Sequence, residues 1–167
     1  MKRDGLILMA GTALLFGCSS YSGSGLVPGQ ANEDAVRAAM GQPSADYRDG
    51  GHHFLEYARG PIGFHTYLAS FDATGRLERI DQILTPDRFA RIQVNTSTQA
   101  DVRRIIGSPG MITRFARTGV EYWDYRYLED RIKMRLYVGF DASGTVVKLE
   151  RMQDPDELGV TGSPGSM

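Results

Sequence analysis

The feature that most constrains how this chain folds is an internal repeat. Three segments recur in the same order: EDAVRAAMGQP (33–43) and QADVRRIIGSP (99–109), FLEY (54–57) and YWDY (122–125), and FDATG (71–75) and FDASG (140–144). The offset between matched segments rises only from 66 to 69 positions, so the second copy is slightly longer than the first. Matched order and spacing over such a length indicate a duplicated module. The chain is therefore predicted to fold as two tandem units of one kind.

Each copy begins with a pattern typical of a short helix. In the second copy, Thr98 is placed to cap the first turn, and Asp101 completes a capping box three residues later. Gly107 and Pro109 then end the helix, because glycine accepts a positive φ and proline cannot continue the helix. The residues between them form one apolar stripe: Val102, Ile105 and Ile106. The first copy repeats the pattern with Asn32 as cap, Val36, Ala39 and Met40 as stripe, and Gly41 and Pro43 as stop.

An additional helix is predicted only before the second copy. Thr85 is a suitable cap, and Pro86 suits the first helical turn. Phe89 and Ile92 are three residues apart, so both are expected to face the core.

The remainder of each copy is predicted to form antiparallel strands. Asp72 and Asp141 can each bond to their own backbone, and the glycine three residues later accepts a positive φ, which is typical of a hairpin turn. The last strands, around 77–80 and 146–149, break the alternation of apolar and polar residues, which predicts a bulge beside each turn.

Two strands of the second copy show which side chains share a face. The strand IKMRLYVGF alternates strictly and places five apolar residues together: Ile132, Met134, Leu136, Val138 and Phe140. The preceding strand places three aromatic residues together: Trp123, Tyr125 and Tyr127. The predicted fold class is therefore α+β, in which each module packs a short helix, or a helix pair, on one face of an antiparallel meander.

The first eighteen residues have the composition of a lipoprotein signal. MKRD carries two cations, and GLILMAGTALLFG is an apolar run that is too short for a membrane-spanning helix but suits a signal peptide. The segment Leu15–Cys18 resembles the lipobox of bacterial lipoproteins, which implies that Cys18 becomes the lipidated first residue. Cys18 is also the only cysteine, so no internal disulfide can form. Ser19 and Ser20 follow in place of an aspartate, which by the sorting pattern of such lipoproteins implies the outer membrane.

These patterns divide the chain into five segments. SSYSGSGLVPGQ, which follows the cysteine, is rich in serine and glycine and is expected to be a flexible tether. The end of the chain, QDPDELGVTGSPGSM, is poor in apolar residues and is expected to be disordered. The predicted boundaries are 1–17 for the signal peptide, 18–31 for the tether, 32–84 for the first module, 85–152 for the second module and 153–167 for the tail.

The second copy resembles the SmpA/OmlA (BamE-like) family. The resemblance rests on TPDRFARI and TQADVRRIIGSP as two helices, on the aromatic strand EYWDYRY and on the FDASG hairpin. Residues 29–84 look like a degenerate copy without the first helix. The resemblance implies a lipoprotein anchored in the outer membrane, facing the periplasm, that binds assembly proteins in β-barrel assembly or envelope maintenance. The tandem architecture also resembles the β-lactamase inhibitory protein, which implies the alternative of an inhibitor or sequestering protein for a periplasmic enzyme.

The sequence shows no set of residues typical of an enzyme. It has no zinc-spaced Cys/His set, no HExxH, no GxSxG and no phosphate-binding glycine loop. His52 and His53 are adjacent in a predicted strand, so their side chains point to opposite faces and are poorly placed to share a metal ion. His65 aligns with Met134 and is expected to face the core. We therefore expect no catalysis, no metal and no cofactor apart from the covalent lipid.

The outward-facing positions of the sheets are the candidate binding residues. With 19 basic and 20 acidic residues the net charge is −1, which gives no reason to expect a nucleic-acid partner. Aromatic residues and arginine are enriched at protein interfaces. The predicted partner-binding residues are Phe54, Phe64 and Leu68 in the first copy and Tyr122, Arg126, Lys133, Arg135 and Tyr137 in the second. For the first-copy patch two alternatives are open: it binds a partner, or it is buried by the other module or by the C-terminal tail.

Overall fold

The computed structural model describes residues 21–60 and 63–157. In the first module a helix precedes four strands: α1 (Glu33–Met40), β1 (Ala45–Asp49), β2 (His52–Arg59), β3 (His65–Phe71) and β4 (Leu77–Gln82). The second module has two helices and four strands: α2 (Pro86–Phe89), α3 (Gln99–Ile106), β5 (Met111–Phe115), β6 (Val120–Glu129), β7 (Ile132–Phe140) and β8 (Val146–Gln153). A short 3₁₀ turn, Pro155–Glu157, follows β8. The prediction of an α+β fold with two tandem modules is confirmed.

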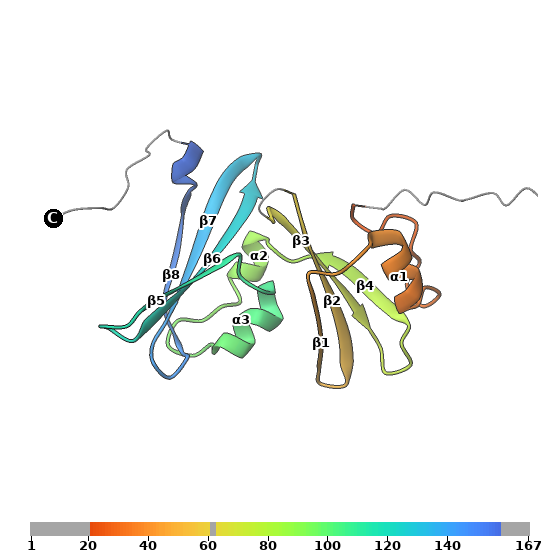
Figure 1. Ribbon diagram of the computed structural model, residues 1–167, viewed down its shortest axis with the longest axis horizontal. Coiled ribbons are helices and arrows are strands. Elements are labelled where there is room, and N and C mark those ends of the chain that lie inside the picture. The colour runs from red at the N-terminus through yellow and green to blue at the C-terminus, as the bar shows by residue number, and fades with distance from the viewer. Residues whose placement is uncertain (1–20, 61–62, 158–167) are drawn as a thin grey trace, which may run out of the picture.

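The elements form four layers, in the order α1, first sheet, α2 with α3, second sheet (Figure 1). Each sheet is an antiparallel meander with strand order β1-β2-β3-β4 or β5-β6-β7-β8. One core cluster joins α1 to the first sheet through Val36, Met40, Leu55, Tyr57, Ala69, Phe71 and Leu77. The other joins α2 and α3 to the second sheet, with Phe89, Val102, Ile106, Trp123, Tyr125, Tyr127, Leu136, Val138, Phe140 and Val146 among its members. The faces predicted for β6 and β7 are thereby confirmed.

The predicted helix boundaries are confirmed in most details. Thr98 and Asp101 form the capping box at the start of α3, and Asn32 caps α1 through its side chain. Gly41 and Gly107 follow α1 and α3 with φ of +83° and +77°. Thr85 precedes α2, but its side chain makes no capping hydrogen bond, so this part of the prediction is wrong.

The two threonines allow a direct test of the capping interaction. Replacing Thr98 with alanine is expected to lower the free energy of unfolding by about 1 kcal/mol, because the backbone N–H of Asp101 loses its acceptor. Replacing Thr85 with alanine is expected to change it much less, since no helix N–H depends on that side chain. Urea unfolding of the two variants measures the difference, and equal losses would contradict the assignment of Thr98 as the cap.

Both predicted hairpin turns and both predicted bulges are present. Asp72 Oδ1 accepts the N–H of Thr74 at 2.8 Å, and Asp141 Oδ1 accepts the N–H of Ser143 at 2.9 Å. The register shifts next to each turn, between Ser70 and Phe71 and at the corresponding place in the second sheet. The sequence prediction did not identify β1 and β5, the first strand of each meander.

Residues 21–31, expected to form part of a flexible tether, instead pack on the first module. The ring of Tyr21 lies edge-on to that of Tyr67, with ring centroids 6.0 Å apart. Leu26 packs against the core cluster of the first module. The tether prediction is therefore wrong for these residues. The predicted signal peptide, Cys18 and the residues up to 20 lie outside the described part of the chain.

The first residues of the predicted tail are also ordered. The backbone N–H of Asp154 donates to the carbonyl of Lys133 at 2.8 Å, and the Asp154 side chain is buried. The expectation of disorder from residue 153 is therefore wrong for 153–157, while 158–167 lie outside the described residues. None of the described helices is long and apolar enough to cross a membrane.

Candidate protein-binding surface

Three of the four sheet faces are covered by helices within the described part of the chain. α1 covers one face of the first sheet, whereas α2 and α3 lie between the two sheets (Figure 1). The outer face of the second sheet, which we call the open face, carries no α-helix among the described residues, and only the short 3₁₀ turn Pro155–Glu157 lies against it, at Arg135. A sheet face left uncovered by its own chain is the natural place to look for a partner.

Polar contacts join the first sheet to the helices of the second module. Glu56, only 2% exposed, accepts hydrogen bonds from the backbone N–H of Ser108 at 3.1 Å and from its hydroxyl at 3.3 Å. Burial raises the pKa of Glu56, and the hydrogen bonds from Ser108 act in the opposite direction. Arg88 of α2 donates to Asp81 of β4 at 2.8 Å. These buried contacts fix the position of one module on the other.

The first-copy patch predicted from sequence is taken up by this contact between modules. Leu68 is 4% exposed and lies opposite Glu56 in the register of β2 and β3, so it faces the helices α2 and α3. Phe64 is 9% exposed, and the ammonium group of Lys133 lies 5.8 Å from its ring centroid. Phe54 is half-buried and stacks on another aromatic ring of the same sheet. Of the two alternatives left open, burial by the other module is the one found for Leu68 and Phe64.

The open face carries most of the second-copy candidates. Tyr122, Arg126, Lys133 and Tyr137 alternate with core residues of β6 and β7, and all four are half-buried. Phe115 on β5 lies edge-on to Tyr122, with ring centroids 5.9 Å apart. The open face therefore combines aromatic rings with basic groups, the mixture that the sequence predicted for a partner surface.

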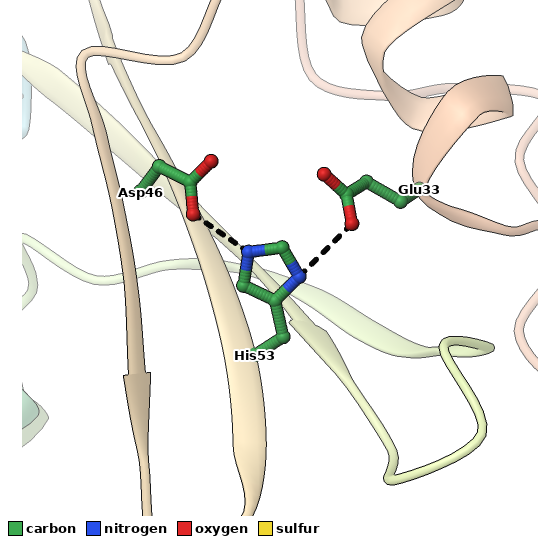
Figure 2. A group of neighbouring side chains, drawn as sticks. All are labelled: Glu33, Asp46 and His53. Carbon is green, nitrogen blue, oxygen red and sulfur yellow. Dashed lines mark hydrogen bonds and ion pairs between the residues drawn. The ribbon is translucent and has the colours of Figure 1, made fainter.

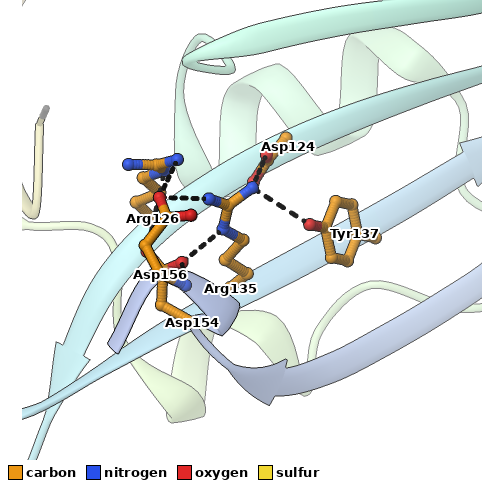
Figure 3. Close-up of polar contacts among 6 residues, drawn as sticks. All are labelled: Asp124, Arg126, Arg135, Tyr137, Asp154 and Asp156. Carbon is orange, nitrogen blue, oxygen red and sulfur yellow. Dashed lines mark hydrogen bonds and ion pairs between the residues drawn. The ribbon is translucent and has the colours of Figure 1, made fainter. Parts of the chain in front are cut away.

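Arg135, the remaining candidate, is buried in an ion cluster instead of facing solvent (Figure 3). Its guanidinium donates to Asp154 at 2.9 Å, to Asp124 at 3.2 Å and to Asp156 at 3.0 Å. The Asp154 side chain is 1% exposed and that of Asp124 7%. The C-terminal turn thus folds back over the cation, and the expectation that Arg135 is a surface contact is wrong.

The pKa values in this cluster follow from burial and attraction. Burial opposes the charge on Arg135, but hydrogen bonds to Tyr137 and Asp154 and the attraction of Asp124 outweigh it, so the pKa is raised. For Asp124 the balance is reversed: burial raises the pKa, and the attraction of Arg135 compensates only in part. Arg135 is therefore firmly charged, and it is the cation on which these buried carboxylates depend.

A second polar cluster, centred on His53, was not found by sequence reasoning (Figure 2). His53 is 5% exposed; its Nδ1 is 3.0 Å from Glu33 of α1 and its Nε2 is 2.6 Å from Asp46 of β1. The guanidinium of Arg37 also bonds to both carboxylates. The three acidic and imidazole groups are close enough to hold a metal ion, but the two carboxylates lie against different ring nitrogens and Arg37 already balances their charge. The cluster ties α1 to the first sheet.

The other histidines do not gather with it. His52 lies 3.3 Å from Glu78 on the other side of its strand, as expected for adjacent strand residues. His65, expected to face the core, is half-buried, and its Nδ1 is 3.3 Å from the hydroxyl of Tyr21. The turn residues Asp72 and Asp141 each bond to their own hairpin. The arrangement of these groups suits structural contacts and surface recognition.

A tandem helix-on-sheet protein with one uncovered sheet face is the class that this fold and this surface define. Residues 82–149 match the family model of the outer membrane protein assembly factor BamE domain. The match falls on the second module and agrees with the resemblance to the SmpA/OmlA (BamE-like) family noted from the sequence. The matched range runs from the end of β4 into β8 and includes the whole helix layer and β5–β7.

The other comparisons add little. No curated protein matches the chain. Among solved structures, the chain is similar to the crystal structure of YjgB, a DUF4309 family protein from Bacillus subtilis, at 15% sequence identity and a TM-score of 0.31. The similarity covers 78% of this chain and 84% of that one.

Proposed function

We propose that this protein is a periplasmic lipoprotein, anchored to the outer membrane through Cys18, that binds a protein partner in outer-membrane assembly through the open face of its second module. At the family level the BamE domain supports a role in outer-membrane protein assembly. The observation that carries the proposal is that the sheet face left uncovered belongs to the module that matches this domain. The first module supports the second by covering its helix layer.

The surface we assign to the partner is smaller than the one predicted from sequence. It contains Tyr122, Arg126, Lys133 and Tyr137, because Arg135 is a buried structural residue, Phe64 and Leu68 are buried, and the half-buried Phe54 lies on the first sheet. Half-buried tyrosines suit this role, since each supplies a large rigid contact area at a low entropy cost.

The packing of residues 21–31 limits how far the proposed lipid anchor can lie from the first module. Three peptide steps separate Cys18 from Tyr21, which spans at most about 10 Å, and Tyr21 is fixed against the first module. A lipid on Cys18 therefore holds the first module close to the membrane. The second module, which follows it in the stack of layers, presents its open face farther from the anchor point.

Co-purification tests the proposed function. Tagged, lipidated protein is extracted in mild detergent and its bound proteins are identified by mass spectrometry, with a Cys18→Ser variant as control for the anchor. We expect barrel-assembly components to co-purify with the wild-type protein. The Tyr122→Ala, Tyr137→Ala double variant is expected to remain folded, with a small loss of stability because Tyr137 accepts a hydrogen bond from Arg135, and to recover at least about tenfold less of them, a loss of some 1.4 kcal/mol of binding free energy.

Two results would contradict the proposal. Undiminished recovery of the partner by the folded double variant would show that the open face is not the binding surface. Recovery of a single soluble periplasmic enzyme, with or without the anchor, would instead support an inhibitor or sequestering protein.

A further inference from the structure

β5 is an edge strand with an unusual composition for that position. Its hydrogen-bonded neighbour is β6, and all five of its residues are exposed. Met111 is 52% exposed, Ile112 39% and Phe115 51%. Edge strands present unpaired N–H and C=O groups, and soluble proteins usually protect them with charges, prolines or a covering element. β5 carries one charged residue, Arg114, whose side chain is paired with Glu121 of β6.

The duplication supplies an internal comparison for this strand. β1 occupies the same place in the first sheet, and its register with β2 matches that of β5 with β6. Where β5 has Ile112 and Phe115, β1 has Asp46 and Asp49, both charged and both paired. One copy of the strand therefore has the usual charge protection, and the other, on the sheet with the open face, has apolar side chains instead.

A cleft at the start of β5 adds an independent observation. It has a volume of about 380 Å³ and is lined by Ala58, Gly63, Gly110, Met111, Asp124 and Arg126. Asp124 is 6% exposed, and its Oδ1 is buried without a hydrogen-bond partner among the described residues. An unpaired buried carboxylate oxygen is costly, and it belongs to a residue that lines the cleft beside the apolar side chain of Met111.

We propose that the outer edge of β5 is a strand-addition site for an extended segment of another polypeptide, with apolar side chains at alternate positions. Backbone hydrogen bonds to β5 would extend the sheet by one strand. Apolar side chains of the incoming segment would pack beside Met111 and Phe115 on the same side of the strand, and its end would lie at the cleft. This inference rests on the proposed function for the kind of partner and names the form in which that partner is recognised.

The chain's own C-terminal residues are poor candidates for this position. The ten residues after Glu157, LGVTGSPGSM, contain three glycines and a proline, a composition that disfavours strand pairing. The nearest acidic residues of that end, Asp154 and Asp156, are held on the face of the sheet by Arg135, and Asp156 also by Arg126.

A labelled peptide tests the proposal directly. The probe is Thr-Val-Thr-Phe-Thr-Val-Thr-Val with a terminal fluorophore, and binding to the full mature chain is followed by fluorescence anisotropy. Two β5 variants carry the charges of β1, Ile112→Asp and Phe115→Asp. The matched control is Val147→Asp, a 40% exposed apolar residue on β8, the opposite edge of the same sheet. A second control is the same peptide with its two central residues replaced by proline, which removes N–H donors from both edges.

We expect the probe to bind the wild-type protein and the Val147→Asp variant equally, and to bind either β5 variant at least about tenfold more weakly. The proline peptide is expected not to bind, and the amide hydrogens of β5 are expected to exchange more slowly with the probe bound. Equal binding by the β5 variants, or by the proline peptide, would overturn strand addition. Concentration-dependent self-association that Phe115→Asp abolishes, without peptide binding, would overturn it in favour of a second copy of this chain.

The two proposals fail in different ways. If β5 variants lose no peptide binding while the tyrosine double variant still loses its co-purifying partner, strand addition is wrong and the proposed function stands. If the peptide binds through β5 but no assembly component co-purifies with the wild-type protein, the proposed function is wrong and the edge serves another polypeptide.

Discussion

Replacing Gly107 with alanine is expected to lower the free energy of unfolding by about 2–5 kcal/mol, among the largest effects of any single methyl group in this protein. The residue has a φ of +77°, which alone costs an alanine about 1–2 kcal/mol. A Cβ there would also lie 2.8 Å from Cδ1 of Ile83 and 2.9 Å from Oε2 of Glu56. Both neighbours are buried between the modules, at 0% and 2% exposure, so neither has free space to move into.

Gly41 is the matched control for this substitution. It ends α1 as Gly107 ends α3, with a φ of +83°, but a Cβ there would meet nothing within 4 Å. Its replacement by alanine is expected to cost only the backbone strain of about 1–2 kcal/mol. Urea unfolding of both variants, with m-values compared, measures the difference. If the two alanines cost the same, the contact between α3 and the first sheet is looser than the structure shows.

Replacing Arg135 with methionine is expected to destabilise the protein by about 3–5 kcal/mol, because removing one partner of a buried ion pair leaves uncompensated charge. After the change, no cation among the described residues lies as close to Asp124 or to Asp154 as the guanidinium of Arg135 does in the wild-type protein. Arg126→Met is the control: its side chain is 25% exposed, its closest carboxylate, on Asp156, is 68% exposed, and it lies 3.7 Å from the buried Asp154 against 2.9 Å for Arg135, so a smaller loss of about 1 kcal/mol is expected.

The loss in Arg135→Met is expected to depend on pH. Burial already raises the pKa of Asp124, and removing Arg135 removes an attraction that lowers it. The folded variant then binds a proton more readily than the unfolded chain, so its stability deficit shrinks as the pH falls through that raised pKa and is largest above it. Thermal unfolding between acidic and neutral pH checks this, and a deficit independent of pH would mean that Asp124 is protonated throughout or that another cation replaces Arg135.

The parts of the fold that the sequence predicted are those set by local patterns. Capping residues, hairpin turns and the alternation of β6 and β7 each depend on residues within a few positions of one another, and the duplication showed each pattern twice. The burial of Leu68 could not be derived in this way. By alternation, Leu68 lies on the face of its strand that points away from the core of its own module. Whether that face meets solvent or another layer depends on where the second module's helices pack.

The errors have similar physical causes. β5 was missed because its exposed side chains show no alternation between a buried and a solvent face. Arg135 was assigned to the surface because alternation reports the face of a sheet and not what folds back over it. His53 lies on β2 and its partners on α1 and β1, so the cluster joins three separate elements that no local pattern links. The sequence did contain a signal for the burial of Arg135. The acidic residues Asp154 and Asp156 directly follow β8, the strand that pairs with the strand of Arg135.

The helix layer between the two sheets has a consequence for how such a chain can grow. The helices of the second copy cover their own sheet on one side and the first sheet on the other, an arrangement that could repeat along the chain as in a solenoid. A third copy added after β8 would cover the open face with its own helices, just as the second copy covers the first sheet. The described chain stops one layer short of that. The open face is therefore equivalent to the face of the first sheet that the second copy's helices cover.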